Sequence, residues 1–194
     1  MDDFEVLKSE VESCTKCNFC KNRTNVVFGE GFRNAEIMCI GEGPGYYEDL
    51  QGRPFVGKSG QLLDKILEVC GFNRREHVFI GNIVKCRPPN NRDPLPEERE
   101  TCIPFLYKQI ELIDPKIIIL LGATALKGLI DPNARITKVR GEWLTWQNRL
   151  IMPTFHPSAL LRNEKLKRPA WEDFKKVVAK YRELVNQEHY SAHC

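Results

Sequence analysis

Ile117 to Leu121, with the sequence Ile-Ile-Ile-Leu-Leu, is the longest uninterrupted apolar run in this chain of 194 residues. It is far too short to span a bilayer, so the sequence does not predict a membrane protein. A short continuous run of this kind is typical of a strand that is buried on both faces of a sheet. Further apolar runs at Ile37–Ile40, Val78–Val84 and Leu150–Phe155 predict three more such strands.

Amphipathic helical patterns separate these predicted strands. Apolar residues recur at helical spacing between Leu62 and Cys70, between Cys102 and Ile113, and between Trp171 and Val185. Buried strands that alternate with such helices indicate an α/β fold, in which helices cover both faces of a mostly parallel sheet. No linker or repeat divides the sequence, so residues 1–194 are predicted to form a single domain.

Functional residues are expected at the carboxyl ends of the parallel strands, where open α/β sheets bind their ligands. Three segments of suitable chemistry follow predicted strands: Gly41–Gly45, Asn82 with the nearby Lys85–Arg87, and His156–Ser158. The sequence therefore predicts that these segments meet at one edge of the sheet.

The charge pattern is compatible with a nucleic-acid partner but does not prove one. The formal net charge is only +3, although Arg162 to Arg182 contains eight Lys or Arg against three Asp or Glu. Such a stretch could contact phosphates, or it could be the solvated face of a helix. The acidic start, Met-Asp-Asp-Phe-Glu, is unlike a signal or transit peptide, so a cytoplasmic protein is expected.

Eight cysteines are unusual in a chain without an export signal, because the cytosol keeps thiols reduced. Cys39 and Cys70 lie in apolar patterns and are predicted to be small buried hydrophobic residues, whereas Cys194 is expected to be frayed. The remaining five are candidates for a metal site: Cys14, Cys17, Cys20, Cys86 and Cys102.

Spacing alone leaves the nature of that site open. Cys14, Cys17 and Cys20 recur every three residues, so any two of them could act together with Cys86 and Cys102. Four thiolates suit either tetrahedral zinc or an iron–sulfur cluster, and the wide separation of the second pair favours a cluster. The alternative is a set of unrelated buried thiols.

Gly52–Ser59 matches the P-loop pattern of nucleoside triphosphatases, in which a glycine-rich loop cradles phosphate. A P-loop follows a buried strand directly, but the preceding residues Tyr46–Gln51 are not strand-like. Gly57-Lys58-Ser59 is therefore predicted only to open the next helix.

Six ordered blocks of sequence resemble the family 4 uracil-DNA glycosylases, the thermostable iron–sulfur branch of the uracil-DNA glycosylase superfamily. The resemblance extends from Cys14 to Arg162. The blocks are Cys14–Cys17, Val27–Gly31, Gly41–Gly45, Gly52–Gly60, Asn82–Pro89 and, after Cys102, His156–Arg162.

The resemblance implies a three-layer α/β sandwich around a central four-stranded, mostly parallel sheet, and an organism that grows at high temperature. It also implies one four-iron–four-sulfur (4Fe-4S) cluster on Cys14, Cys17, Cys86 and Cys102. Cys20 is then a non-ligand.

The activity that the resemblance implies is DNA repair: uracil is flipped out of single- or double-stranded DNA and its N-glycosidic bond is hydrolysed. Phe55 would stack on the flipped base, and the Asn82 amide would distinguish uracil from cytosine because it both donates and accepts. Without the resemblance, a core Phe and a structural Asn would be ordinary interpretations. The expected uracil-binding residues are Gly41, Glu42, Gly43, Phe55, Asn82 and His156.

His156 and Glu42 are the predicted catalytic residues. A neutral His156 would donate a hydrogen bond to uracil O2, where negative charge develops. Gly43 stands where the best-known branch of the superfamily has a water-activating Asp, so the adjacent Glu42 is the candidate to orient water. Because no lysine is placed as a nucleophile, an abasic site without strand cleavage is expected, and Glu48 is a candidate for excluding the thymine methyl group.

Contacts with DNA are expected just after the histidine. Leu160 or Leu161 could wedge into the base stack, and Arg162 could contact phosphate. The protein is expected to be a monomer with no membrane partner, and residues 187–194 to be a flexible tail. The competing interpretation is a zinc-stabilised nucleic-acid-binding module without catalysis.

Overall fold

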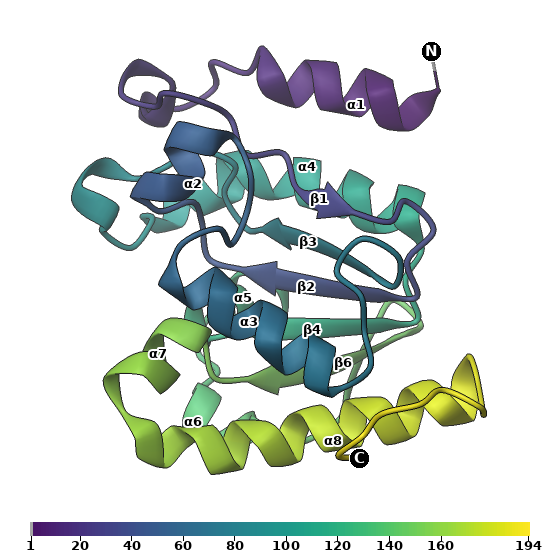
Figure 1. The fold of residues 1–194 in the computed structure, drawn as a ribbon. Helices are drawn as coiled ribbons and strands as arrows, with labels where there is room; N and C mark the ends of the chain where they lie inside the picture. The colour runs from purple at the N-terminus through teal and green to yellow at the C-terminus, as the bar shows by residue number, and fades with distance from the viewer. Residues whose placement is uncertain (1) are drawn as a thin grey trace.

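The computed structural model describes residues 2–194. A central sheet lies at the middle of the fold (Figure 1). Four of its strands run parallel: β2 (Ile37–Gly41), β3 (Val78–Asn82), β4 (Ile117–Leu121) and β6 (Arg149–Thr154). The prediction of an α/β sandwich with four parallel strands is confirmed.

Two short antiparallel edge strands were not predicted. β1 (Glu30–Gly31) pairs with β3, and β5 (Leu144–Trp146) pairs with β6. The sheet therefore has six strands in the order β1-β3-β2-β4-β6-β5, instead of four. Strands of two or three residues are too short to show a hydrophobic period in the sequence.

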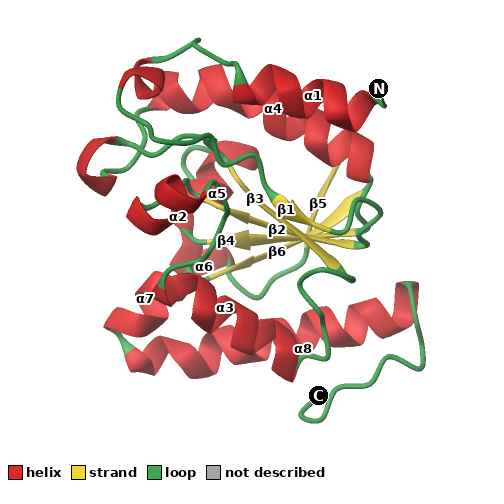
Figure 2. Cartoon of the chain, turned by 45° about the horizontal axis from the view of Figure 1, so that its top comes forward, coloured by secondary structure: helices red, strands yellow, loops and turns green. Residues whose placement is uncertain are grey.

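Helices cover both faces of the sheet, as Figure 2 shows, with α1 and α4 on one side and α3 and α8 on the other. Three predicted helices are confirmed as α3, α4 and α8, while α1 was not predicted. The helices are α1 (Asp3–Glu12), α2 (Tyr46–Gln51), α3 (Lys58–Val69), α4 (Pro96–Ile113), α5 (Ala123–Leu129), α6 (Ile136–Val139), α7 (Pro157–Arg162) and α8 (Lys167–Leu184).

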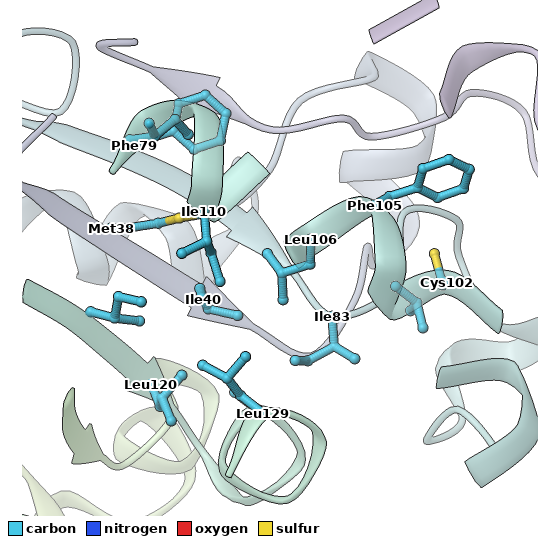
Figure 3. Close-up of a cluster of buried hydrophobic side chains, with 14 of the residues drawn as sticks. Met38, Ile40, Phe79, Ile83, Cys102, Phe105, Leu106, Ile110, Leu120 and Leu129 are labelled. Atoms are coloured by element: carbon cyan, nitrogen blue, oxygen red, sulfur yellow. The ribbon is translucent and has the colours of Figure 1, made fainter. Parts of the chain in front are cut away.

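Alternating strand residues divide the core into two layers, because successive side chains of a strand point to opposite faces. On β2, Met38 and Ile40 pack with the residues of α4, whereas Ile37 and Cys39 pack with those of α3 and α8. Figure 3 shows the first layer, in which Ile110 of α4 lies beside Met38 and Ile40. Every residue of β2, β3 and β4 is buried, so the packed core fixes the positions of the carboxyl ends of these strands.

That residues 187–194 form a flexible tail stays a prediction, and the structure shows specific contacts between this segment and the rest of the domain. Residues 187–194 contain no helix or strand among the described residues, yet the His189 ring stacks on Phe72 with ring centres 4.5 Å apart. His189 Nε2 also donates to the Cys70 carbonyl at 2.9 Å, and Arg182 Nη2 donates to the carbonyl of Cys194 at 3.1 Å. The imidazole acts here as a flat packing surface, which the polar composition of the tail conceals.

No helix between residues 2 and 194 combines the length and apolar character that crossing a membrane requires.

Candidate active site

The carboxyl ends of the parallel strands meet at one edge, as predicted. Gly41, the last residue of β2, lies in register with Asn82, the last residue of β3. At the neighbouring strand ends, the Gly122 amide after β4 donates to the carbonyl of Thr154 at 2.9 Å, and His156 follows two residues later. Three chain segments that are far apart in sequence are thus brought to one place.

Phe55, Asn82 and His156 converge beside Gly41. A Cβ atom on Gly41 would lie 2.6 Å from Asn82 Oδ1 and 2.7 Å from Phe55 Cζ, so only glycine leaves room for both groups. The Phe55 and His156 rings are stacked, with centres 5.5 Å apart and planes at 29°. An aromatic face, an amide and an imidazole therefore lie together at this edge of the sheet, and we call this group of side chains the pocket.

Asn82 Oδ1 is buried and has no hydrogen-bond partner among residues 2–194. An unpaired buried acceptor is costly, because it has lost its bonds to water without replacing them. This oxygen is therefore poised to accept a hydrogen bond from a ligand that enters the pocket.

The hydrogen bonds of His156 determine which of its two ring nitrogens carries the proton. Nδ1 accepts from the backbone N–H of Ser158 at 3.1 Å, so in the neutral ring the proton is on Nε2. Burial, together with a smaller contribution from the charge of Arg162, lowers the pKa of His156 to about 4. At neutral pH His156 is an uncharged donor through Nε2.

Glu42 directly follows Gly41, the last residue of β2. Its Oε2 accepts from the Thr124 hydroxyl at 2.5 Å. Burial raises the pKa of Glu42, and the bond from Thr124 opposes that shift. Thr124 is in the first turn of α5, and the preceding Gly122 lies against His156, where a Cβ atom would be 2.9 Å from His156 Cβ. Glu42 and His156 thus lie beside the same helix start.

The segment that resembled a P-loop serves another purpose. Gly52 ends α2 in a left-handed conformation, and α3 begins at Lys58, so the prediction that Gly-Lys-Ser merely opens a helix is confirmed. Glu48 Oε1 accepts from the amides of Val56 (2.9 Å) and Gly57 (3.0 Å) and thereby holds the loop that carries Phe55. That Glu48 excludes the thymine methyl group stays a prediction.

A second cavity lies between α1, α4 and the chain that follows β3. The cysteines Cys14, Cys17, Cys86 and Cys102 line it, together with apolar side chains. Cys20 is not one of the described residues around the cavity, and its thiol points to the Thr15 carbonyl at 3.9 Å.

Cationic and N–H groups surround these thiols. Arg23 Nη1 lies 3.2 Å from Cys86 Sγ, and the Lys85 amide donates to Cys102 Sγ at 3.3 Å. Burial raises the pKa of the Cys102 thiol to about 11 and also raises that of Cys86, so both are protonated until a metal displaces the protons.

The four cysteines suit a metal ion or cluster that is bound by thiolates, since their sulfurs share one cavity and positive charges lie nearby. Within residues 2–194, no three His, Cys, Asp or Glu side chains converge closely enough to hold a single ion. The sulfurs line a space instead of pointing at one centre.

Comparison with known proteins gives the family. The model of the Uracil DNA glycosylase superfamily matches residues 28–175. The chain belongs to the uracil-DNA glycosylase superfamily. A type-4 uracil-DNA glycosylase of Thermotoga maritima is 51% identical over 177 residues, which cover 89% of this chain and 92% of that protein.

Two archaeal type-4 uracil-DNA glycosylases agree with this assignment. The protein of Sulfurisphaera tokodaii is 47% identical over 186 residues, covering 91% of this chain and 84% of the relative. That of Archaeoglobus fulgidus is 42% identical over 185 residues, covering 91% and 92%. The predicted family is confirmed.

The leucine pair after the superfamily's His-Pro-Ser segment is resolved by exposure. Leu160 is only 2% exposed and packs inward, so it is the less accessible of the two leucines predicted to contact DNA, and that contact stays a prediction. Leu161 is 46% exposed. Adjacent residues of a six-residue helix such as α7 face different directions, which the sequence of so short a helix does not reveal.

The basic stretch divides into two groups. Lys167, Lys175 and Lys180 pair with glutamates three residues away along the chain, as on an ordinary solvated helix face. Arg162, Lys165 and Arg168 are exposed and have no ion-pair partner in the described chain. These three are the better candidates for phosphate contact.

Sequence analysis missed several residues that position the site of this glycosylase-family chain. Thr124 binds Glu42, Ser158 orients His156, and Arg74 binds the loop of Phe55. Of these three residues, only Ser158 could have been found from the local sequence. It lies two residues after His156, which is the spacing at which the side chain before a helix accepts from a backbone N–H in the first turn. The partners of the other two are distant in the sequence.

Proposed function

We propose that this protein is a monofunctional uracil-DNA glycosylase, which flips uracil out of DNA, hydrolyses its N-glycosidic bond and leaves an abasic site. The observation that carries the proposal is the convergence of Phe55, Asn82 and His156 on the space beside Gly41. Its setting in a chain of the uracil-DNA glycosylase superfamily supports the same activity.

Recognition of uracil rests on the Asn82 amide. Its unpartnered Oδ1 would accept from uracil N3–H, and its Nδ2 would donate to O4. Cytosine presents the reverse pattern at these two positions, so it would leave both groups of Asn82 unsatisfied. Phe55 stacks on the flipped ring and accepts any planar base, so selectivity lies mainly with the amide.

The chemical step requires charge stabilisation and a positioned water. As the bond between C1′ and uracil N1 breaks, negative charge develops on uracil O2, and the Nε2–H of neutral His156 donates to that oxygen. Glu42, held by Thr124, accepts a proton from the water that attacks C1′. A pKa raised by burial makes Glu42 a stronger base than an ordinary carboxylate.

The thiol cavity is proposed to hold one 4Fe-4S cluster on Cys14, Cys17, Cys86 and Cys102. Bound there, the cluster would brace the N-terminal segment against α4, and hydrolysis needs no electrons from it. Arg23 and the Lys85 amide would offset the negative charge of the thiolates. A brown colour of the purified protein, with iron and sulfide found on analysis, would support the cluster, whereas one zinc per chain would overturn it.

Single- and double-stranded DNA that contains uracil is the proposed substrate. Leu161 would hold the gap left by the flipped base, and Arg162 would contact phosphate. The proposal includes a monomer that acts in the cytoplasm.

Release of uracil from labelled oligonucleotides tests the function. The native protein should release uracil from a single strand and from U·G and U·A duplexes, and leave an intact strand with an abasic site. DNA binding without release would overturn the proposal in favour of a non-catalytic nucleic-acid-binding module.

A further inference from the structure

Phe55 has a backbone conformation that needs support. Its φ of +51° lies in the left-handed region, which is unfavourable for a bulky residue that is not glycine. Such conformations persist only when the surrounding contacts hold them. The direction of the Phe55 ring, and with it the aromatic face of the pocket, depends on those contacts.

Two side chains bind the backbone of this loop from opposite directions. On one side, Glu48 accepts from the amides of Val56 and Gly57. On the other, Arg74 Nη1 donates to the carbonyl of Phe55 at 2.8 Å, and Arg74 Nη2 donates to the carbonyl of Pro54. The peptide groups on both sides of the Phe55 side chain are thereby held.

Arg74 is itself held by two carboxylates from different elements. Its Nη1 lies 3.0 Å from Asp64 Oδ1 on α3, and its Nε lies 3.5 Å from Glu30 Oε1 on β1. The Arg74 side chain is only 13% exposed. The guanidinium therefore joins the edge strand, α3 and the loop, and it has little freedom to move.

Close packing behind the loop explains why the carbonyl of Phe55 points to Arg74. A Cβ atom on Gly60, in the first turn of α3, would lie 1.8 Å from the Phe55 oxygen. The helix thus allows that carbonyl to approach only because residue 60 is glycine. A donor must then satisfy the oxygen, and Arg74 supplies it.

We propose that Arg74 is a positioning residue for uracil excision, which holds the Phe55 ring in its base-stacking orientation by gripping the carbonyls of Pro54 and Phe55. This inference rests on the proposed function for its effect on rate. It depends on the planar fork of arginine, which donates to two carbonyls and to Asp64 and also forms an ion pair with Glu30, whereas lysine presents a single nitrogen.

A double-mutant cycle tests whether Arg74 acts through Phe55. R74Q should lower the single-turnover rate of uracil release about tenfold, because a small displacement of a positioning contact is costly in an active site. In an F55A background the same change should lower the rate less than about twofold, since coupled residues are not additive. In an N82A background the full effect of R74Q should persist.

The matched control is R75Q. Arg75 is the exposed neighbour of Arg74, and its side chain makes no hydrogen bond or ion pair among the described residues, so R75Q makes the same change in charge without removing a contact. R75Q should release uracil at the native rate. R74K should resemble R74Q, because one ammonium group cannot replace the fork.

Hydrogen exchange gives a readout that does not depend on activity. In R74Q the amides of Val56 and Gly57 should exchange about tenfold faster than in the native chain, because local opening becomes easier. The amides of β4 should be unchanged. A loss of protection in β4 as well would show general unfolding and overturn the inference.

Equal rate losses for R74Q in the native and F55A backgrounds would also overturn it, as would native protection of Val56 and Gly57 in R74Q. If the native chain itself releases no uracil, the proposed function fails, while the exchange of Val56 and Gly57 still decides whether Arg74 holds the loop.

Discussion

The base pocket and the thiol cavity are built in different ways. The pocket takes Gly41, Asn82 and His156 from the ends of strands that are buried and hydrogen-bonded to one another. The cavity joins a segment near the N-terminus, with Cys14 and Cys17, to the chain after β3 and to α4. One site rests on the sheet, and the other connects segments outside it.

This difference shows which of the two sites has its side chains arranged, and in the required protonation state, before a ligand binds. In the pocket, Nδ1 of His156 is bound, Nε2 is free to donate, and Asn82 Oδ1 awaits a donor. In the cavity, buried thiols with raised pKa values must lose protons when a metal binds. Changes in the pocket should therefore affect rate and leave stability intact, whereas changes in the cavity should affect stability first.

The largest effect on rate is expected from H156A. Loss of one preorganised donor to a developing oxyanion should lower the single-turnover rate about 10²- to 10³-fold. DNA affinity and the melting temperature should change little. H193A, which removes an exposed histidine of the tail, is the matched control and should be as fast as the native protein. Near-native rates for H156A would break the comparison on the pocket side.

C102S tests the other half of the comparison. Replacing one proposed ligand should lower the free energy of unfolding by about 3 kcal/mol, as expected when a metal site is lost, and should reduce the iron content. C20S is the control, because Cys20 lies outside the cavity, and it should keep both iron and stability. The comparison fails if C20S and C102S lose equal amounts of iron.

The leucine pair of α7 sharpens the distinction between packing and function. L160A should lower the free energy of unfolding by about 2–3 kcal/mol, because it creates a cavity in the core. L161A should leave stability unchanged and slow excision from duplexes about tenfold, with little effect on single strands, if an inserted side chain holds the gap in the stack. Thermal melts and parallel assays on the two substrates measure both effects.

The pH profile should separate the two proposed catalytic groups, Glu42 and His156. Glu42 must be ionised to accept a proton, so the native rate should fall as the pH drops through its pKa, which burial raises above the ordinary 4.5. In E42Q that limb should disappear, and the residual rate should stay flat until the pH nears 4, where His156 becomes protonated. An E42Q profile that still falls at the same pH as the native limb would assign the limb to another group.

The same shift predicts a small effect on stability. The pKa of His156 in the folded protein, about 4, is below its ordinary 6.5, so the unfolded chain binds the proton more readily. The stabilising contribution of neutral His156 is complete above pH 6.5 and is lost as the pH falls through 4. The difference in melting temperature between the native protein and H156A should therefore change between pH 7 and pH 4.

Sequence patterns predicted the sheet and the meeting of Gly41, Asn82 and His156 at one edge, because both follow from short-range rules, whereas the place of Phe55 beside them was implied only by the family resemblance. Continuous apolar runs marked β2, β3, β4 and β6, and residues that follow parallel strands meet at one edge. The rules failed where the pattern was too short, as in β1 and β5. They also could not tell which of two adjacent leucines in α7 is buried, Leu160, and which is exposed, Leu161.

Residues that position others were harder to predict, because their partners are distant in sequence. Thr124 and Glu42 are 82 residues apart, and Arg74 binds Phe55 across 19 residues. The contacts of the tail were not predicted for a related reason, since His189 packs on Phe72, far away in the chain. Such contacts depend on the tertiary fold, and no local period in the sequence reports them.

A crystal structure of the protein with bound uracil tests the central claim most directly. The account predicts that uracil lies against Phe55, with N3 about 3 Å from Asn82 Oδ1 and O2 about 3 Å from His156 Nε2, the distances of ordinary hydrogen bonds. Uracil bound elsewhere, or a ring in the pocket that neither Asn82 nor His156 contacts, would contradict it.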